Sequence, residues 1–226
     1  MEAQFKEMAA LIGDPTRATI LWTLLDGKAL PATELALAAD TSPQNISMHL
    51  ARLLQAGLLS AERQGRHRYY RFSGHEVAYA VEAMASLIPR PARPHAAAEN
   101  LSPIKYCRTC YDHLAGRIGV AVTDSLLKQK IIQVSNGGFD IGRKGRQWFL
   151  DLGIDANALQ QERRSFLRPC LDWSERRHHI AGSLAASLLD KMLADDWIRR
   201  TRASRAVVIT GSGKKYLYKY FKVAAE

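Results

Sequence analysis

The sequence has few cysteines and no long apolar run, and each shortage excludes a class of protein. Three cysteines in 226 residues are an odd number, and they do not make the disulfide framework of a small secreted protein. No segment approaches the roughly 18 consecutive apolar residues of a membrane-spanning helix. The N-terminus MEAQFKEM carries acidic residues where a signal peptide needs basic and then apolar ones. We therefore expect a cytoplasmic protein with reduced thiols and no membrane partner.

Positive charge is present in excess but is unevenly distributed. The net charge is +10, yet residues 1–88 hold 8 Lys and Arg against 9 Asp and Glu, whereas residues 104–226 hold 22 against 12. A positive surface favours a polyanionic partner. In the first part the cations are concentrated in one segment, RQGRHRYYR at residues 63–71. This segment is the first candidate for a contact with nucleic acid.

A proline-containing segment divides the chain into two domains. Residues 89–103, PRPARPHAAAENLSP, contain four of the eight prolines. Proline lacks a backbone donor and restricts the residue before it, so the segment is predicted to be an extended linker. The domains are then residues 1–88 and 104–226, each large enough for its own core.

The first domain is predicted to contain helices and one basic hairpin. Asp14 suits a helix N-cap and Pro15 the first helical position, and Gly27 ends that helix. Two β-prone runs, LLSAER and HRYYRF, are joined around Gly65 and predict a hairpin. Apolar spacing predicts helices at residues 5–12, 15–25, 32–39, 43–55 and 76–88, with Phe5, Met8, Ala9 and Ile12 on the inner face of the first. The order is that of a winged helix-turn-helix in a mainly α protein with small β-hairpins.

The predicted helix in TSPQNISMHLARLLQAGLL, residues 41–59, has the features of a DNA-reading helix. Ser42 suits the N-cap and Pro43 the first turn, and the apolar residues recur on one face. Long side chains on the opposite face can bond base edges in a major groove or meet a thymine methyl, while cations of the hairpin can contact phosphates. The residues assigned to this surface are Ser42, Gln44, Met48, Arg52 and Gln55 in the helix, and Arg63, Arg66, His67 and Arg68 in the hairpin.

Several short motifs occur together in residues 1–88. They are GDPTR at residues 13–17, ELA at 34–36, Ser47-x-His49-Leu50, Leu53-x3-Gly57-Leu58, and Arg63-x-Gly65-Arg66 followed by Tyr69-Tyr70. With these motifs the segment resembles the arsenic-repressor (ArsR) family of bacterial winged-helix regulators. The resemblance implies a homodimer on near-palindromic double-stranded operator DNA, normally a repressor whose DNA affinity falls when a small inducer or metal ion binds.

The same resemblance implies DNA contacts at particular positions. The family's contacts fall on Gln44, Asn45, Ser47 and His49 in the helix and on Arg63, Gln64 and Arg66 in the wing. His49 also lies beside Leu53 by helical angle. A packing role for His49 therefore stays open beside a phosphate contact.

The resemblance also shows where an inducer site is missing. Sensors of this family place thiolates on the third helix, but ALPATELALAAD has neither cysteine nor histidine. Others use Asp and His ligands along the last helix, which here offers His75, Glu76 and Glu82 without a second histidine. We therefore expect the inducer to bind the second domain.

The second domain contains all three cysteines. Cys107 and Cys110 form CRTC just before Asp112 and His113, and Cys170 precedes DWSERRHH. Thiolates with imidazoles can bind a thiophilic metal or metalloid such as Zn²⁺, As(III) or Sb(III), a CxxC can be a redox switch, and buried thiols can be idle. These three roles for the cysteines stay open. We expect DNA binding itself to require no cofactor. The candidate sensor residues are Cys107, Cys110, Cys170, Asp112, His113, His178 and His179.

An internal repeat organises the second domain. HLAGRIGVAVTDSLLKQKII from His113 matches HIAGSLAASLLDKMLADDWI from His179 at a constant offset. We predict a duplicated helix–hairpin–helix, winged-helix-like unit, with the two histidines at equivalent helix starts beside a seam between the halves. Internal caps or core histidines are the alternative.

Together these patterns predict a sequence-specific DNA-binding transcriptional regulator, a ligand-released repressor, and not an enzyme. Two alternatives stay open. In one, the second domain is enzyme-like, with Cys110 and His113 three residues apart on a helix face as a nucleophile pair. In the other, it is purely architectural and clamps DNA or the dimer without a ligand.

Overall fold

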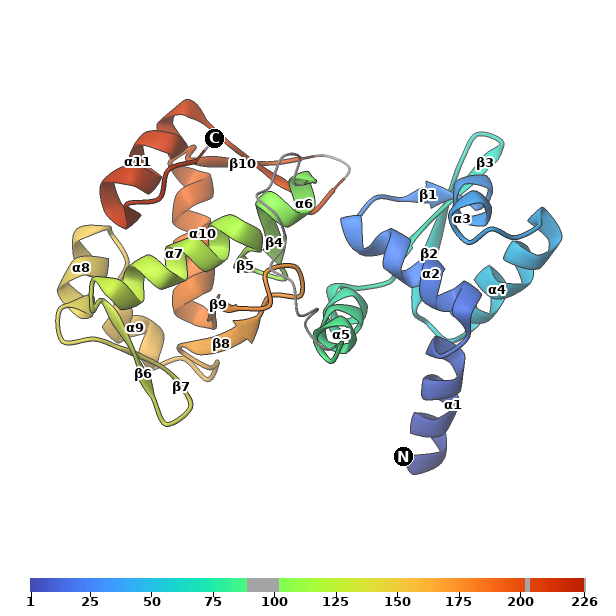
Figure 1. Cartoon of the computed structure of the whole chain (residues 1–226), viewed down its shortest axis with the longest axis horizontal. Coiled ribbons are helices and arrows are strands. Elements are labelled where there is room, and N and C mark those ends of the chain that lie inside the picture. The colour runs from blue at the N-terminus through green and yellow to red at the C-terminus, as the bar shows by residue number, and fades with distance from the viewer. Residues whose placement is uncertain (89–101, 202–203, 226) are drawn as a thin grey trace. The chain divides into compact units, whose positions relative to one another are not determined.

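The computed structural model describes residues 1–88, 102–201 and 204–225. The chain divides into two compact units, Met1–Met84 and Ala85–Glu226 (Figure 1). The predicted linker lies outside the described residues except for Ser102 and Pro103, and Pro103 begins a short helix. Among the described residues, none of the helices combines the length and the apolar character needed to cross a membrane.

The N-terminal unit is a winged helix-turn-helix with the predicted order of elements. Its strands form an antiparallel sheet of order β1–β3–β2, in which the short β1 was not predicted from the sequence. The elements are α1 (Glu2–Ile12), α2 (Pro15–Thr23), η1 (Leu24–Asp26), β1 (Leu30–Pro31), α3 (Ala32–Ala38), α4 (Pro43–Gln55), β2 (Leu59–Gln64), β3 (His67–Phe72) and α5 (His75–Ser86).

Side-chain caps determine where α2 and α4 begin. The Asp14 carboxylate accepts the backbone N–H of Arg17 at 2.9 Å, and the Ser42 hydroxyl accepts that of Asn45 at 3.2 Å. Each cap satisfies a donor that has no partner within the helix. The Arg17 guanidinium in turn donates to the carbonyl of Ala10 at 3.2 Å, so the GDPTR motif joins the end of α1 to the start of α2.

The core of this unit lies between α2, α3 and α4, and α1 reaches it only with its last residues, Leu11 and Ile12, which pack against it and are partly buried. The buried residues include Ile20, Leu35, Leu50 and Leu53. No residue of α1 is buried, and Phe5 is 73% exposed. The prediction that Phe5 lies on an inner face is wrong for the single chain, because α1 extends away from the other helices of its unit (Figure 1).

The C-terminal unit contains one succession of elements twice: hairpin, helix, hairpin, helix. The first hairpin of each half was not predicted from the sequence. After α6 (Pro103–Tyr106), the first half contains β4 (Arg108–Cys110), β5 (His113–Ala115), α7 (Gly116–Lys128), β6 (Ile132–Ser135), β7 (Gly138–Ile141), α8 (Gly145–Asp151) and the additional α9 (Ala156–Gln160). The second contains β8 (Arg168–Leu171), β9 (His178–Ala181), α10 (Ser183–Ala194), β10 (Ile198–Arg200), β11 (Val207–Ile209) and α11 (Gly211–Phe221).

Equivalent close contacts in the two halves support the predicted repeat. Gly145 at the start of α8 packs on the carbonyl of Ile131, and Gly213 in α11 packs on the carbonyl of Trp197. A Cβ at these glycines would lie only 2.2 Å and 1.8 Å from the two oxygens. The same backbone approach therefore requires glycine at the same place in each half.

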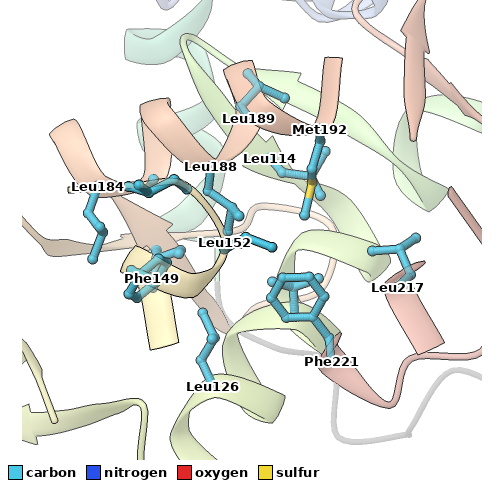
Figure 2. Packing of buried hydrophobic residues seen from close by; sticks show 14 of the residues in the cluster. Leu114, Leu126, Phe149, Leu152, Leu184, Leu188, Leu189, Met192, Leu217 and Phe221 are labelled. Atoms are coloured by element: carbon cyan, nitrogen blue, oxygen red, sulfur yellow. The ribbon is translucent and has the colours of Figure 1, made fainter. Parts of the chain in front are cut away.

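One hydrophobic core joins the two halves. Helices α7 and α10 cross in the middle of the unit (Figure 1), and their apolar faces belong to a single buried cluster. Because both halves fill this core, they fold as one unit. Figure 2 shows Leu114, Leu126, Phe149, Leu152, Leu184, Leu188, Leu189, Met192, Leu217 and Phe221 of this cluster.

Candidate nucleic-acid interface and thiol–histidine cluster

Helix α4 presents a long, mostly uncharged polar face to solvent. Ile46, Leu50 and Leu53 are fully buried and hold the helix by its other side. The face can therefore approach a partner without disturbing the core. Its exposed residues are Ser42, Gln44, Asn45, Ser47, Met48, Arg52 and Gln55.

Local hydrogen bonds orient the first turn of this face. The Asn45 side-chain amide donates to the Thr41 hydroxyl at 2.8 Å, and the Ser47 hydroxyl donates to the carbonyl of Pro43 at 2.8 Å. Side chains that are oriented before binding lose less rotamer freedom when they meet a ligand. The start of α4 is thus the most ordered part of the candidate interface.

His49 is placed differently from the other residues predicted to contact DNA. It is buried, with its Nδ1 atom 3.4 Å from Oδ1 of Asp14. Its helical angle turns it toward the core side of α4 and toward the cap of α2. We therefore correct the prediction for His49: it packs between the two helices instead of facing a nucleic acid.

The hairpin of β2 and β3 carries cations at its exposed tip. Gln64 pairs with His67 across a turn in which Gly65 has a φ of 61°, a left-handed conformation that favours glycine. The preceding pair places Arg63 directly opposite Arg68. Like charges in directly opposite positions repel, so an anion bound at this tip would relieve the repulsion. All of these residues and Arg66 are exposed.

In the C-terminal unit, four of the predicted sensor residues converge. One ligand-type atom from each lies within 4.8 Å of all the others, and all four residues are buried. Each hairpin supplies one cysteine and the histidine directly opposite it in the register. The sequence predicted the two histidines at helix starts, but the structure places all four residues in the strands before α7 and α10. They are Cys110, His113, Cys170 and His179.

A carboxylate lies behind each histidine of this cluster. Nδ1 of His113 is 3.2 Å from Asp112, and Nδ1 of His179 is 3.4 Å from Asp172. The two Nε2 atoms face each other at 3.2 Å. Each aspartate follows a cysteine by two positions, as CYD at residues 110–112 and CLD at 170–172. Sequence reasoning overlooked Asp172, although this repeated C-x-D was visible.

Buried hydrogen bonds set the charge of Asp172 and His179. Burial alone would raise the pKa of Asp172, but the bonds to His179 and Ser174 and the charge of Arg108 hold it well below its usual range. Burial alone would lower the pKa of His179, but its bonds to Asp172 and Cys110 raise it. Hydrogen bonds outweigh desolvation in both cases, and they keep an anionic carboxylate behind the imidazole.

The other predicted sensor residues are outside the cluster. Cys107 lies in the hydrophobic core, where burial raises the pKa of its thiol to about 12, and His178 is exposed. The two cysteines of CRTC therefore do not act as a pair, and none of the three cysteines forms a disulfide. Cys110 and His113 lie on a hairpin and not on a helix face, and they are only 3% and 1% exposed. The helix-face arrangement expected for a nucleophile pair is therefore not the one that this hairpin has.

Known proteins are similar to this chain over different lengths. A model of a helix-turn-helix domain matches residues 12–60. The HTH-type transcriptional regulator YdfF of Bacillus subtilis (strain 168) is 40% identical over 224 residues, which is 99% of each chain. The arsenical resistance operon repressor of Escherichia coli (strain K12) is 36% identical over 76 residues, 34% of this chain and 65% of that one. The solved homodimeric winged helix-turn-helix domain of Mb0332 from Mycobacterium bovis is 27% identical, with 36% of this chain and 75% of that chain covered and a TM-score of 0.34.

Proposed function

Because the chain belongs to the ArsR family of helix-turn-helix transcriptional regulators, we propose that it is a repressor. It binds its operator as a homodimer and leaves it when a ligand binds the C-terminal unit. The observation that carries the proposal is the exposed amide-rich face of α4 beside a hairpin with an unbalanced cationic tip.

The chemistry of these two surfaces suits double-stranded DNA. In helix-turn-helix proteins the first residues of the second helix contact base edges, and this is where Gln44 and Asn45 lie. Side-chain amides bond adenine bidentately, and an apolar side chain such as Met48 can meet a thymine methyl. The hairpin arginines would contact phosphates, which adds affinity that salt weakens.

A second copy of the chain is the proposed partner of α1. In this helix Phe5 is 73% exposed and no residue is buried, and the family resemblance implies a homodimer. Pairing two copies through α1 would bury surface that a single chain leaves in water. It would also place two α4 helices on successive major grooves, as a near-palindromic operator requires.

Ligand sensing is proposed for the C-terminal unit because of where soft ligands occur. Residues 1–88 contain no cysteine, and α3 contains no histidine. Cys110 and Cys170 with their opposite histidines supply a buried cluster elsewhere. A ligand that favours one arrangement of the DNA-reading helices by about 1–3 kcal/mol would suffice for a typical response.

Base reading is tested with two glutamine variants. An operator is selected with the full-length chain from random duplexes, and binding is measured on the operator and on a scrambled duplex. Gln44→Ala is expected to lose about 1–3 kcal/mol on the operator and little on the scrambled sequence. Gln133→Ala is the matched control, because Gln133 is an exposed glutamine of β6 in the C-terminal unit, outside the candidate interface. Equal losses in both variants would reject the assignment.

Phosphate contact is tested through the salt dependence of binding. Arg63→Gln is expected to weaken binding to both duplexes alike and to reduce the slope of log affinity against log salt by about one. Arg71→Gln is the control, because Arg71 lies 4.0 Å from Glu62 and is already paired. An unchanged slope for Arg63→Gln would contradict the role of the hairpin.

A further inference from the structure

The thiol–histidine cluster of the C-terminal unit carries a more specific conclusion. We propose that it is a tetrahedral site for one divalent cation of the zinc type. Its four ligands are Cys110, His113, Cys170 and His179. The inference deepens the proposed function, because it names the class of ligand that the C-terminal unit binds. Its regulatory part, release from the operator, rests on the proposed function.

The donor set and its charge suit such an ion. Two sulfur and two nitrogen ligands in a tetrahedron are typical of structural Zn²⁺ sites, and their geometry distinguishes them from the oxygen sites of Mg²⁺ or Ca²⁺. Two thiolates, Cys110 and Cys170, would balance the charge of a divalent ion, so the buried centre would carry no net charge. Neutrality matters because an unbalanced charge in the interior is costly.

The spacing of the ligand atoms agrees with a tetrahedron. Two nitrogens bound to zinc at about 2.0–2.1 Å lie about 3.3–3.4 Å apart, and two sulfurs at about 2.3 Å lie about 3.8 Å apart. The Nε2 atoms of His113 and His179 are separated by 3.2 Å, and all four ligand atoms lie within 4.8 Å of one another. A single ion can therefore reach all four with small side-chain adjustments.

The carboxylates behind the histidines supply an independent argument. Asp112 and Asp172 are acceptors, so each favours the tautomer that carries its proton on Nδ1. The Nε2 atoms of His113 and His179 then direct lone pairs at each other across 3.2 Å. Two facing lone pairs repel unless a proton or a metal ion lies between them, so the pair is a place for a cation. A zinc-bound imidazole commonly donates its second ring N–H to a carboxylate, and Asp112 and Asp172 are placed to accept such a bond.

The position of Cys107 narrows the choice of ion. A pyramidal As(III) site takes three thiolates, and the third cysteine of this chain lies in the hydrophobic core with its thiol strongly protonated. The cluster offers only two thiolates and two imidazoles. The site therefore favours Zn²⁺ and ions of similar preference, such as Co²⁺, over arsenite.

An ion at this place would join the two halves of the C-terminal unit. The first hairpin gives Cys110 and His113, and the second gives Cys170 and His179. Binding therefore fixes the position of one half against the other, whereas each hairpin alone provides only two ligands. This is the element through which metal occupancy would change the DNA affinity of the full chain.

The site is tested first by metal binding to the full-length chain. The protein is stripped with a chelator under reducing conditions and titrated with Co²⁺, whose tetrahedral thiolate complexes absorb strongly in the visible range. We expect one equivalent per chain, displaced by Zn²⁺ and not by arsenite. Cys110→Ser and Cys170→Ser should lose the bands, whereas Cys107→Ser, the matched buried cysteine, should keep them. Loss in Cys107→Ser equal to that in the other two would overturn the proposal.

A wild-type measurement protects the test against variants that fail to fold. Thiol alkylation followed by peptide mass analysis should show Cys110 and Cys170 protected in the Zn²⁺-loaded chain and modified after chelation, with Cys107 the same in both. Asp112→Asn should keep the site but weaken Co²⁺ binding about 10–100-fold, as loss of a carboxylate behind a ligand does. Protection that does not depend on Zn²⁺, or no stoichiometric binding, would refute the site.

Operator binding with and without Zn²⁺ separates this inference from the proposed function. Metal binding with a changed operator affinity supports both. Metal binding with the same operator affinity supports the site and refutes metal-controlled release. Operator binding without any metal binding refutes the site and leaves the DNA-binding proposal standing.

Discussion

The Nε2 atoms of His113 and His179 lie 3.2 Å apart, although 66 positions separate the two residues in the sequence. Each belongs to the second strand of the hairpin that opens its half of the C-terminal unit. Because each hairpin also places a cysteine opposite its histidine, this one contact between the halves is made of side chains of a type that can bind a metal.

Removing one partner of the buried ion pair of Arg108 and Asp172 should strongly destabilise the chain. Their atoms are 3.0 Å apart and their side chains are 1% and 0% exposed. Asp172→Ala leaves a buried guanidinium beside no carboxylate and should cost about 3–5 kcal/mol. Asp124→Ala removes the exposed partner of Arg177 and should cost less than about 1 kcal/mol. Urea unfolding with a chelator present measures both, and equal losses would contradict the distinction.

The glycines of α11 should respond in opposite directions to the same substitution. Gly213→Ala would place a Cβ 1.8 Å from the carbonyl of Trp197, whereas a Cβ at Gly211 meets nothing within 4 Å. We expect Gly213→Ala to destabilise the chain by at least about 1–3 kcal/mol. Gly211→Ala should be neutral or should stabilise it by up to about 1 kcal/mol. Thermal unfolding of the two variants compares them, and a tolerated Gly213→Ala would show that α11 can move.

The cap of α2 should make a pH-dependent contribution to stability. The hydrogen bond from the backbone of Arg17 lowers the pKa of Asp14 from its ordinary value of 3.8, burial acts in the opposite direction, and the charges of Arg17 and His49 lower it further. A lowered folded-state pKa stabilises the protein above the unfolded-state value, and this contribution disappears as the pH falls through the folded-state value. Asp14→Ala should cost about 0.5–2 kcal/mol at pH 7.

The pH profile distinguishes charge from geometry at this cap. The difference in unfolding free energy between wild type and Asp14→Ala should shrink as the pH falls below about 4. Asp14→Asn keeps an acceptor without a charge, so its difference from Asp14→Ala should stay nearly constant with pH. A wild-type advantage that persists unchanged at pH 3 would show that the charge contributes nothing.

Exposed Phe5 should matter for association and not for the folding of one chain. Phe5→Ser is expected to shift full-length protein from dimer toward monomer in light scattering, because it removes apolar surface from α1. Leu37→Ser is the matched control, since Leu37 is 84% exposed on α3. If Leu37→Ser dissociates the protein as strongly as Phe5→Ser, the dimer is formed through another surface.

The N-terminal unit was largely predictable because its signals are local. Asp14 and Ser42 cap helices within three residues of themselves, and a helix with apolar residues on one side forms wherever that side can be buried. The exposed face of α4 followed from this periodicity. His49 did not, because its angle lies at the edge of that face, and only packing against Asp14 decided which side it joined.

The sequence by itself determined which side chains could bind a soft metal, namely the cysteines and histidines of the second domain. Only the tertiary structure decided which of them meet. The strands β4, β5, β8 and β9 are three or four residues long, and strands this short have little propensity signal of their own. Their pairing brings Cys110 to His113 and Cys170 to His179, while the shared core brings the two hairpins together and leaves Cys107 elsewhere. Contacts between residues 66 positions apart depend on the packing of the whole unit, and no local sequence pattern predicts them.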